Sequence, residues 1–183
     1  MGKVYFYYGT MSAGKTSLAI NKAYEFREKG RNVYVCVPSL VKKDKLESRN
    51  GSSVDVDLVL DNEEYDSCVD KIEEFSTLII DEAQFLNEHQ VGLLKSLSED
   101  LSLSVFCFGL LTDYKMNLFE GSKALIQYAD SIRELPSMCD FCENKAKYNF
   151  RTTNDHKQVV LDKNIYKTLC YDCFIRYSNK DEA

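Results

Sequence analysis

Short apolar runs alternate along this chain with longer segments whose apolar residues recur at helical spacing. The apolar runs predict strands at Lys3–Tyr8, Asn32–Val37, Thr77–Ile80, Leu103–Phe108 and Ser131–Leu135. Alternation of Val54, Val56, Leu58 and Leu60 with other residues predicts one more strand, with a solvent-exposed face. Helical spacing predicts helices at Lys15–Lys29, Glu63–Phe75, Glu88–Ser98 and Ser122–Tyr128. This order favours an α/β fold with a mainly parallel sheet and right-handed crossovers.

The character of the chain changes at Pro136. Beyond it, paired cysteines, polar residues and short β segments replace the alternation of strands and helices. We therefore expect a larger α/β domain at residues 1–135 and a small C-terminal domain at residues 136–183.

The charge balance argues against a protein that binds the nucleic-acid backbone. The 29 acidic and 23 basic residues give a net charge of −6. The local basic cluster of Lys42, Lys43 and Lys45 is interpreted as a solvated loop. No apolar run approaches the ~18–20 residues of a membrane span, and no export signal precedes the first strand. We expect a cytoplasmic protein without nucleic-acid or membrane partners.

A phosphate-binding sequence follows the first predicted strand. Gly9-Thr10-Met11-Ser12-Ala13-Gly14-Lys15-Thr16 matches G-x-x-x-x-G-K-[ST] at every specified position, and a helix follows it. Glycines let the backbone N–H groups converge on a polyphosphate, and the helix adds its positive N-terminal end. Lys15 is placed to reach the β- and γ-phosphates, and Thr16 to offer its hydroxyl to Mg²⁺. The motif predicts binding of a nucleoside triphosphate.

A second acidic element ends the buried strand Thr77–Ile80. Asp81 has the position of an acid that supports Mg²⁺ at the carboxyl end of a parallel strand. We expect Glu82 to point the other way and to accept a proton from an attacking hydroxyl or water. Gln84 could hold the nucleophile or a phosphate. The alternative is that the acids only cap the next helix.

Two classes of function agree with these motifs. The first is a kinase that phosphorylates a small hydroxyl acceptor. The second is a motor-like or nucleic-acid-remodelling ATPase, because a strand followed by Asp-Glu-Ala-Gln also resembles helicase motifs. A motor needs a second ATPase lobe or a partner that supplies an arginine, and a basic track for the strand. The length of 183 residues and the net charge of −6 favour the kinase.

Four of the seven cysteines form two pairs, Cys139-x-x-Cys142 and Cys170-x-x-Cys173. Four thiolates make a closed, structural Zn²⁺ site, which would stabilise a small region with little core. Redox-active or unpaired cysteines are the alternative. Residues 143–169 between the pairs are expected to form a long loop suited to a lid. Cys36, Cys68 and Cys107 are isolated in apolar surroundings, as small core residues are.

The P-loop, Asp81–Phe85 and the paired cysteines, in this order and at this length, resemble the type II thymidine kinases. The resemblance also covers Phe108–Tyr114, Phe119–Ser122 and Ala146–Arg151. It implies a P-loop NTPase-like, RecA-like domain followed by a zinc-binding domain that carries a substrate-covering lasso. It further implies Mg²⁺-dependent transfer of the ATP γ-phosphoryl group to the 5′-hydroxyl of thymidine or deoxyuridine, for pyrimidine salvage and DNA synthesis. Members are commonly homotetramers that thymidine triphosphate inhibits.

The resemblance also implies roles for individual residues, with Glu82 as the general base and the four paired cysteines as zinc ligands. ATP and Mg²⁺ would contact Gly9, Thr10, Met11, Ser12, Ala13, Gly14, Lys15, Thr16, Asp81, Glu82, Ala83 and Gln84. The nucleoside would contact Met11, Leu110, Tyr114, Phe119, Asn149, Lys157, Gln158, Val159, Val160, Leu161 and Tyr166, of which Lys157–Leu161 belong to the lasso.

Several positions depart from the family pattern. Tyr114 stands where Phe is frequent, Leu161-Asp162 replaces a usual Gly-Gly, and Tyr171 replaces a frequent Arg. The segment Lys42–Gly51 is shorter than usual and lacks a clear Asp-x-Arg. Asp44 and Arg49 are the candidate site residues in that segment.

Overall fold

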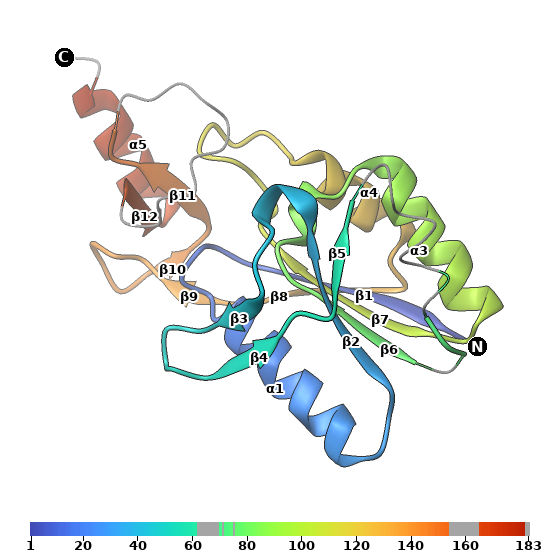
Figure 1. Cartoon of the computed structure of the whole chain (residues 1–183). Coiled ribbons are helices and arrows are strands. Elements are labelled where there is room, and N and C mark those ends of the chain that lie inside the picture. Colours follow the sequence, from blue (N-terminus) through green and yellow to red (C-terminus); the bar gives the residue numbers. More distant parts are fainter. Residues whose placement is uncertain (62–69, 71, 75, 154–164, 182–183) are drawn as a thin grey trace.

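A six-stranded parallel sheet forms the centre of the molecule (Figure 1). The computed structural model describes residues 1–61, 70, 72–74, 76–153 and 165–181. The strand order is β5-β2-β6-β7-β1-β8, and every neighbouring pair is parallel. The strands are β1 (Lys3–Tyr8), β2 (Val33–Pro38), β5 (Leu58–Leu60), β6 (Thr77–Ile80), β7 (Ser104–Gly109) and β8 (Ser131–Glu134). The expected α/β fold with a mainly parallel sheet is confirmed.

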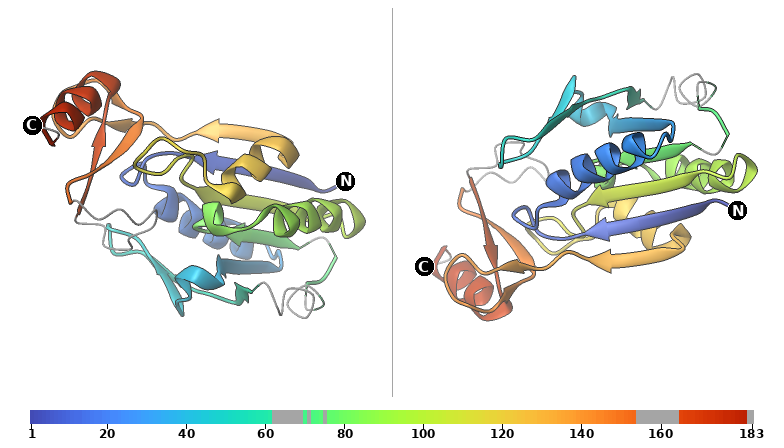
Figure 2. Two further views of the ribbon diagram at one scale, coloured as in Figure 1. Left: turned by 90° about the horizontal axis from the view of Figure 1, so that it is seen from above. Right: turned by 90° about the horizontal axis from the view of Figure 1, so that it is seen from below.

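Helices cover both faces of this sheet. Figure 2 shows α1 (Lys15–Glu28) on one face, and α3 (Glu88–Asp100) with α4 (Glu120–Tyr128) on the other. Two buried clusters result. Ile20 of α1 packs in one cluster with Ile79 of β6, while Leu94 and Leu125 pack in the other with Leu78. Every residue of β6 is buried, which explains its uninterrupted apolar run.

The single strand expected over residues 54–60 is wrong. β4 (Ser53–Asp55) pairs with β3 (Lys45–Glu47) in an antiparallel hairpin, whereas β5 joins the main sheet beside β2. The chain changes partner near Asp57, whose carboxylate accepts hydrogen bonds from the Val35 amide (2.7 Å) and from Arg27 (2.9 Å). Burial still alternates across the break, so periodicity could not show the change of partner strand.

A small unit of short strands and one helix follows the main sheet. β9 (Ser137–Met138) pairs with β10 (Lys145–Ala146), β11 (Tyr148–Arg151) pairs with β12 (Tyr166–Leu169), and α5 covers Tyr171–Asp181. The sequence did not indicate α5. Residues 143–169 are not simply a long loop, because three strands lie within them. The division into domains at 1–135 and 136–183 stays a prediction.

Some expectations fall on parts of the chain that are not described. The helix expected at Glu63–Phe75 lies largely outside the described residues, and so does Cys68. Cys36 and Cys107 are fully buried, which confirms them as core residues.

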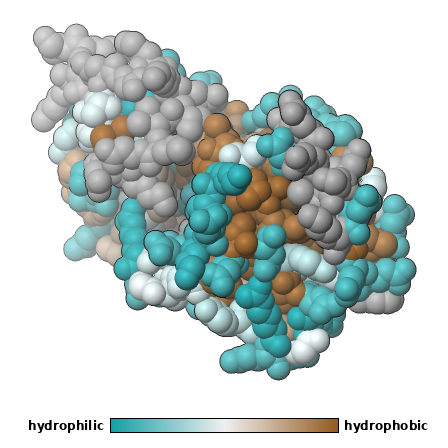
Figure 3. Space-filling view, in the orientation of Figure 1, coloured by the Kyte–Doolittle hydropathy of each residue, from teal (hydrophilic) through white to brown (hydrophobic). Residues whose placement is uncertain are grey.

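The surface is mainly hydrophilic on the face shown in Figure 3, but an apolar area lies over β5. β5 is an edge strand in the sheet order, where Val59 is half-buried and Leu58 and Leu60 are buried. Among the described residues, no helix has the length and apolar content needed to cross a bilayer.

Candidate active site

The loop between β1 and α1 depends on two of its glycines. Gly14 adopts a left-handed φ of 73°, which residues with a side chain rarely adopt. A Cβ added at Gly9 would lie 2.6 Å from the Ala13 Cβ atom and 2.7 Å from the Leu135 carbonyl oxygen. In the described part of the chain no side chain caps the N-terminus of α1. The positive end of this helix therefore remains available to an anion.

Lys15 lies across this loop. Its Nζ donates hydrogen bonds to the carbonyl oxygens of Gly9 (3.2 Å) and Thr10 (2.6 Å), and its side chain is buried. The motif thus folds so that a cation and the start of a helix meet at one point. This is the arrangement that a polyphosphate requires.

Asp81 follows β6 and faces the same loop. It is 1% exposed, and its Oδ2 accepts a hydrogen bond of 3.0 Å from the Thr16 hydroxyl. Burial and the charge of Glu82 raise the pKa of Asp81, against the opposing effects of Lys43, Thr16 and Lys15. The hydroxyl and the carboxylate are the pair of groups that supports Mg²⁺ in P-loop proteins. The donor set therefore fits this ion.

The interpretation of Lys42, Lys43 and Lys45 as one solvated loop is wrong for Lys43. Lys42 and Lys45 are exposed, but Lys43 Nζ lies 3.7 Å from Asp81 Oδ2 and its side chain is only 31% exposed. The physical reason is the short connection from β2 to β3, which brings this lysine to the carboxyl end of β6. Lys43 thus adds a second cation beside the acidic element.

Glu82 leaves the strand in a left-handed conformation, with a φ of 54°. Its Oε2 accepts a hydrogen bond of 2.8 Å from Gln84 Nε2. Gln84 is 2% exposed, and its Oε1 accepts a bond of 3.0 Å from the Leu110 amide beyond β7. Both polar atoms of Gln84 therefore have protein partners. This geometry places Gln84 Nε2 against the Glu82 carboxylate, and the expected hold of Gln84 on a nucleophile or phosphate stays a prediction.

A cavity of about 230 Å³ lies between the loop and Glu82. Its walls are the P-loop with the start of α1, the acidic element, and residues 47–50, which end β3 and follow it. The lining residues are Met11, Ser12, Gly14, Lys15, Thr16, Ser17, Glu47, Ser48, Arg49, Asn50, Glu82 and Leu110. A carboxylate, an ammonium group and a hydroxyl face one space, which allows proton acceptance beside a bound phosphate.

The segment from Asp44 to Asn50, which contains β3, was only partly expected in this cavity. Arg49 lines it, whereas Asp44 is not among the lining residues. Glu47, Ser48 and Asn50 were missed, because no phosphate or metal motif includes them. The available signal was the glycine-ended run Ser48–Gly51, which marks a turn.

The residues expected to contact a nucleoside are partly brought together. Met11 and Leu110 line the cavity, and the Met11 amide donates a hydrogen bond of 2.9 Å to Asn149 Oδ1. Tyr114 and Tyr166 both contact Arg151, which was not among the expected site residues. Its signal was its place at the end of the Ala146–Arg151 motif.

The remaining expected nucleoside contacts stay predictions. Phe119 is buried and packs edge to face on Phe85, with ring centroids 5.7 Å apart. The lasso residues Lys157, Gln158, Val159, Val160 and Leu161 lie outside the described residues.

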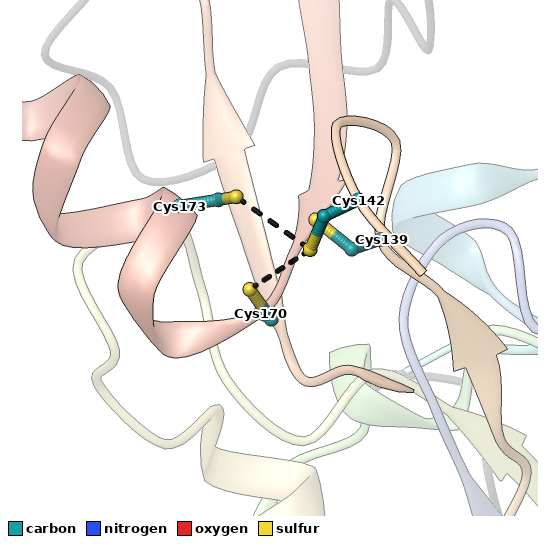
Figure 4. A group of neighbouring side chains, drawn as sticks. All are labelled: Cys139, Cys142, Cys170 and Cys173. Carbon is teal, nitrogen blue, oxygen red and sulfur yellow. Dashed lines mark hydrogen bonds between the residues drawn. The ribbon is translucent and has the colours of Figure 1, made fainter. Parts of the chain in front are cut away.

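The four paired cysteines form one cluster (Figure 4). Cys139 and Cys142 lie in the loop after β9, Cys170 follows β12, and Cys173 belongs to α5, so both pairs point inward. All four sulfur atoms lie within 4.8 Å of one another. Cys142 Sγ lies 3.6 Å from Cys170 Sγ and 3.8 Å from Cys173 Sγ. Sulfur atoms about 2.3 Å from one tetrahedral zinc ion lie about 3.8 Å apart. The cluster therefore fits zinc.

Comparisons with known proteins agree with these features. The sequence pattern of the thymidine kinase family, described as "Thymidine kinase", matches residues 2–174. A thymidine kinase of Mesorhizobium japonicum is 35% identical, over 93% of this chain and 89% of the relative. Thymidine kinases of Haemophilus influenzae (37%; 87% and 85%) and Pasteurella multocida (36%; 88% and 86%) are similarly related. The chain therefore belongs to the thymidine kinase family.

Proposed function

We propose that this chain is an ATP-dependent thymidine kinase that forms the 5′-monophosphate of thymidine or deoxyuridine. The observation that carries the proposal is that Glu82 and the P-loop residues Lys15 and Thr16 line one cavity. Membership in the thymidine kinase family supports a small-molecule acceptor.

The reaction divides between two sets of residues. The P-loop backbone and Lys15 bind the triphosphate and stabilise the charge that develops during transfer. The 5′-oxygen of the nucleoside forms a bond to the γ-phosphorus while the bond from that phosphorus to the bridging oxygen of ADP breaks. Glu82 Oε accepts the proton that leaves the 5′-hydroxyl, and ADP leaves with the bridging oxygen. Gln84 holds Glu82 in place for this step.

Metal ions would have separate roles. Thr16 and Asp81 would hold Mg²⁺, which neutralises phosphate charge when bound. Cys139, Cys142, Cys170 and Cys173 would hold a structural Zn²⁺ ion, since a closed set of four thiolates leaves no position for chemistry.

The nucleoside would lie between the two parts of the molecule. Tyr114 and Phe119 belong to the main domain, whereas Asn149 and Tyr166 belong to the cysteine-bearing unit. Aromatic faces with a few polar groups suit a flat pyrimidine. The lasso residues 157–161 would complete this pocket and offer main-chain hydrogen bonds to the base.

Other properties follow from the family resemblance. We propose a cytoplasmic homotetramer, feedback inhibition by thymidine triphosphate, and a functional division at residue 136. Mass measurement in solution tests the tetramer, and titration of the activity with thymidine triphosphate tests the inhibition.

A transfer assay with γ-labelled ATP tests the central proposal. Purified protein is offered thymidine, deoxyuridine, other nucleosides and single-stranded DNA in parallel. Labelled thymidine or deoxyuridine monophosphate without DNA stimulation is the expected result. ATP hydrolysis that depends on DNA, with no labelled nucleotide, would instead support the motor-like ATPase.

A further inference from the structure

Strand β11 connects the cysteine-bearing unit to two loops of the main domain. Its alternate residues Asn149 and Arg151 share one face and are 5% and 4% exposed. Asn149 accepts the hydrogen bond from Met11 in the P-loop. Arg151 reaches the loop between β7 and α4 instead. One strand face thus contacts both loops that flank the proposed nucleoside pocket.

The guanidinium of Arg151 contacts two tyrosines. Its Cζ is 3.8 Å from the ring centroid of Tyr114 and 5.2 Å from that of Tyr166. Lys115 Nζ lies 5.5 Å from the same Tyr114 centroid. A cation within about 6 Å of an aromatic face is attracted by the ring quadrupole, and this attraction increases when the pair is desolvated. The contact with Arg151 therefore helps to hold the Tyr114 ring in its position.

Arg151 also fixes the hydroxyl of Tyr166. Nε and Nη2 of Arg151 donate to this oxygen at 3.1 and 2.6 Å. A phenolic hydroxyl has one proton to donate, and here its oxygen is held as an acceptor. The Tyr166 proton is consequently directed away from the guanidinium. Tyr166 comes from β12, so the same arginine also braces the β11–β12 hairpin.

We propose that Arg151 is a positioning residue of the nucleoside pocket, which sets the Tyr114 ring and the Tyr166 hydroxyl for binding of the pyrimidine nucleoside. This role rests on the proposed thymidine kinase function. Arg151 acts through the two tyrosines, so its loss weakens binding of the nucleoside and leaves binding of ATP nearly unchanged. The planar fork and the stacked plane are properties of arginine that lysine does not share.

Steady-state kinetics and equilibrium thymidine binding of Arg151→Met and Arg151→Lys test this role. Both variants should raise the thymidine KM and Kd about tenfold or more, because desolvated cation–π contacts and charge-assisted hydrogen bonds are lost. The KM for ATP should stay within about twofold, since no step of the phosphate site is changed. Equal increases for thymidine and ATP would overturn a specific positioning role.

One further variant separates positioning from folding. Tyr166→Phe keeps the ring and removes the hydroxyl, and its effect on thymidine Kd should not add to that of Arg151→Met. Full additivity in this cycle would overturn the proposal. If Arg151→Met does not fold, Tyr166→Phe alone must raise the thymidine Kd.

The matched control is Arg133→Met. Arg133 is exposed and lies over Tyr7, with Cζ 5.9 Å from the ring centroid, but it belongs to β8 of the main sheet. Its removal should leave the thymidine KM unchanged. If the wild type is active and Arg151→Met has an unchanged thymidine KM, the role of Arg151 is overturned but the proposed function stands. A wild type that does not phosphorylate thymidine or deoxyuridine overturns the proposed function and this role with it.

Discussion

The hydrogen bond from Gln84 to Glu82 can be removed without changing Glu82 itself. Gln84→Met keeps the length of a side chain that is 2% exposed, but it removes both hydrogen-bonding atoms. The bond from Nε2 to the Glu82 carboxylate and the bond from the Leu110 amide to Oε1 are then lost. Glu82 keeps its carboxylate but loses the group that orients it.

The expected cost follows from these two bonds. A hydrogen bond to a charged group contributes about 1.5–3 kcal/mol and a neutral bond about 1 kcal/mol. The free energy of unfolding of Gln84→Met should therefore fall by about 2.5–4 kcal/mol. Loss of a positioned base costs up to about 10²–10⁴-fold in rate. Because Glu82 remains present, the expected decrease of kcat is about 10–100-fold.

Chemical denaturation and thymidine kinase kinetics measure the two effects separately. Gln90→Met is the matched control, since Gln90 is also a buried glutamine and caps α3 through its contacts with Asn87. The control should also lose stability, by about 1 kcal/mol for the neutral bond from the Asn87 amide to Gln90 Oε1, and should keep its kcat. A wild-type kcat in Gln84→Met, or an equal loss of kcat in both variants, would refute the bracing role.

Three further predictions concern other parts of the molecule. Cys170→Ser should contain less zinc, as measured by elemental analysis, and should raise the thymidine KM more than the ATP KM. An unchanged zinc content would contradict the four-thiolate site. Thr77 Oγ1 is buried without a hydrogen-bond partner among the described residues. Thr77→Val should therefore raise the free energy of unfolding, measured by chemical denaturation, by about 1 kcal/mol. A lower free energy of unfolding in this variant would contradict the prediction. Burial raises the pKa of Asp130, but hydrogen bonds from the Val4 amide and Lys95 outweigh it and lower this pKa below 3.8. The stabilisation is present above pH 3.8 and is lost as the pH falls through the lowered pKa. The free energy of unfolding, measured by denaturation from pH 6 to 3, should therefore fall more steeply in wild type than in Asp130→Asn. The same pH dependence in both proteins would exclude this contribution.

The parts of the site that could be predicted are those with local physical causes. Gly9, Gly14 and Lys15 act within one turn of backbone, so their spacing alone predicts a phosphate loop. The two Cys-x-x-Cys pairs carry their geometry in their spacing in the same way. The strands of the main sheet also follow from local patterns, because both faces are covered and a continuous apolar run results.

The parts that could not be predicted depend on contacts between distant segments. The bond from Leu110 to Gln84 and the contact of Lys43 with Asp81 join residues that no sequence period relates. The change of partner strand near Asp57 preserves the alternation of burial, so the sequence pattern carries no sign of it. The expected direction of Glu82 depends on strand geometry, but its φ of 54° places it in the following turn.

The central claim is that Glu82 accepts the proton of the nucleoside hydroxyl. Glu82→Gln keeps the size of the side chain and an oxygen that can accept the bond from Gln84. Binding of ATP and thymidine, measured at equilibrium, should therefore remain close to wild type.

Single-turnover transfer of the γ-phosphoryl group to thymidine by Glu82→Gln is the most direct test, with Glu99→Gln, an exposed surface carboxylate, as control. The rate should fall by about 10²–10⁴-fold, which corresponds to about 3–5 kcal/mol in the activation barrier. The control should retain the wild-type rate. A rate of Glu82→Gln within a few-fold of wild type would show that the proton leaves by another route.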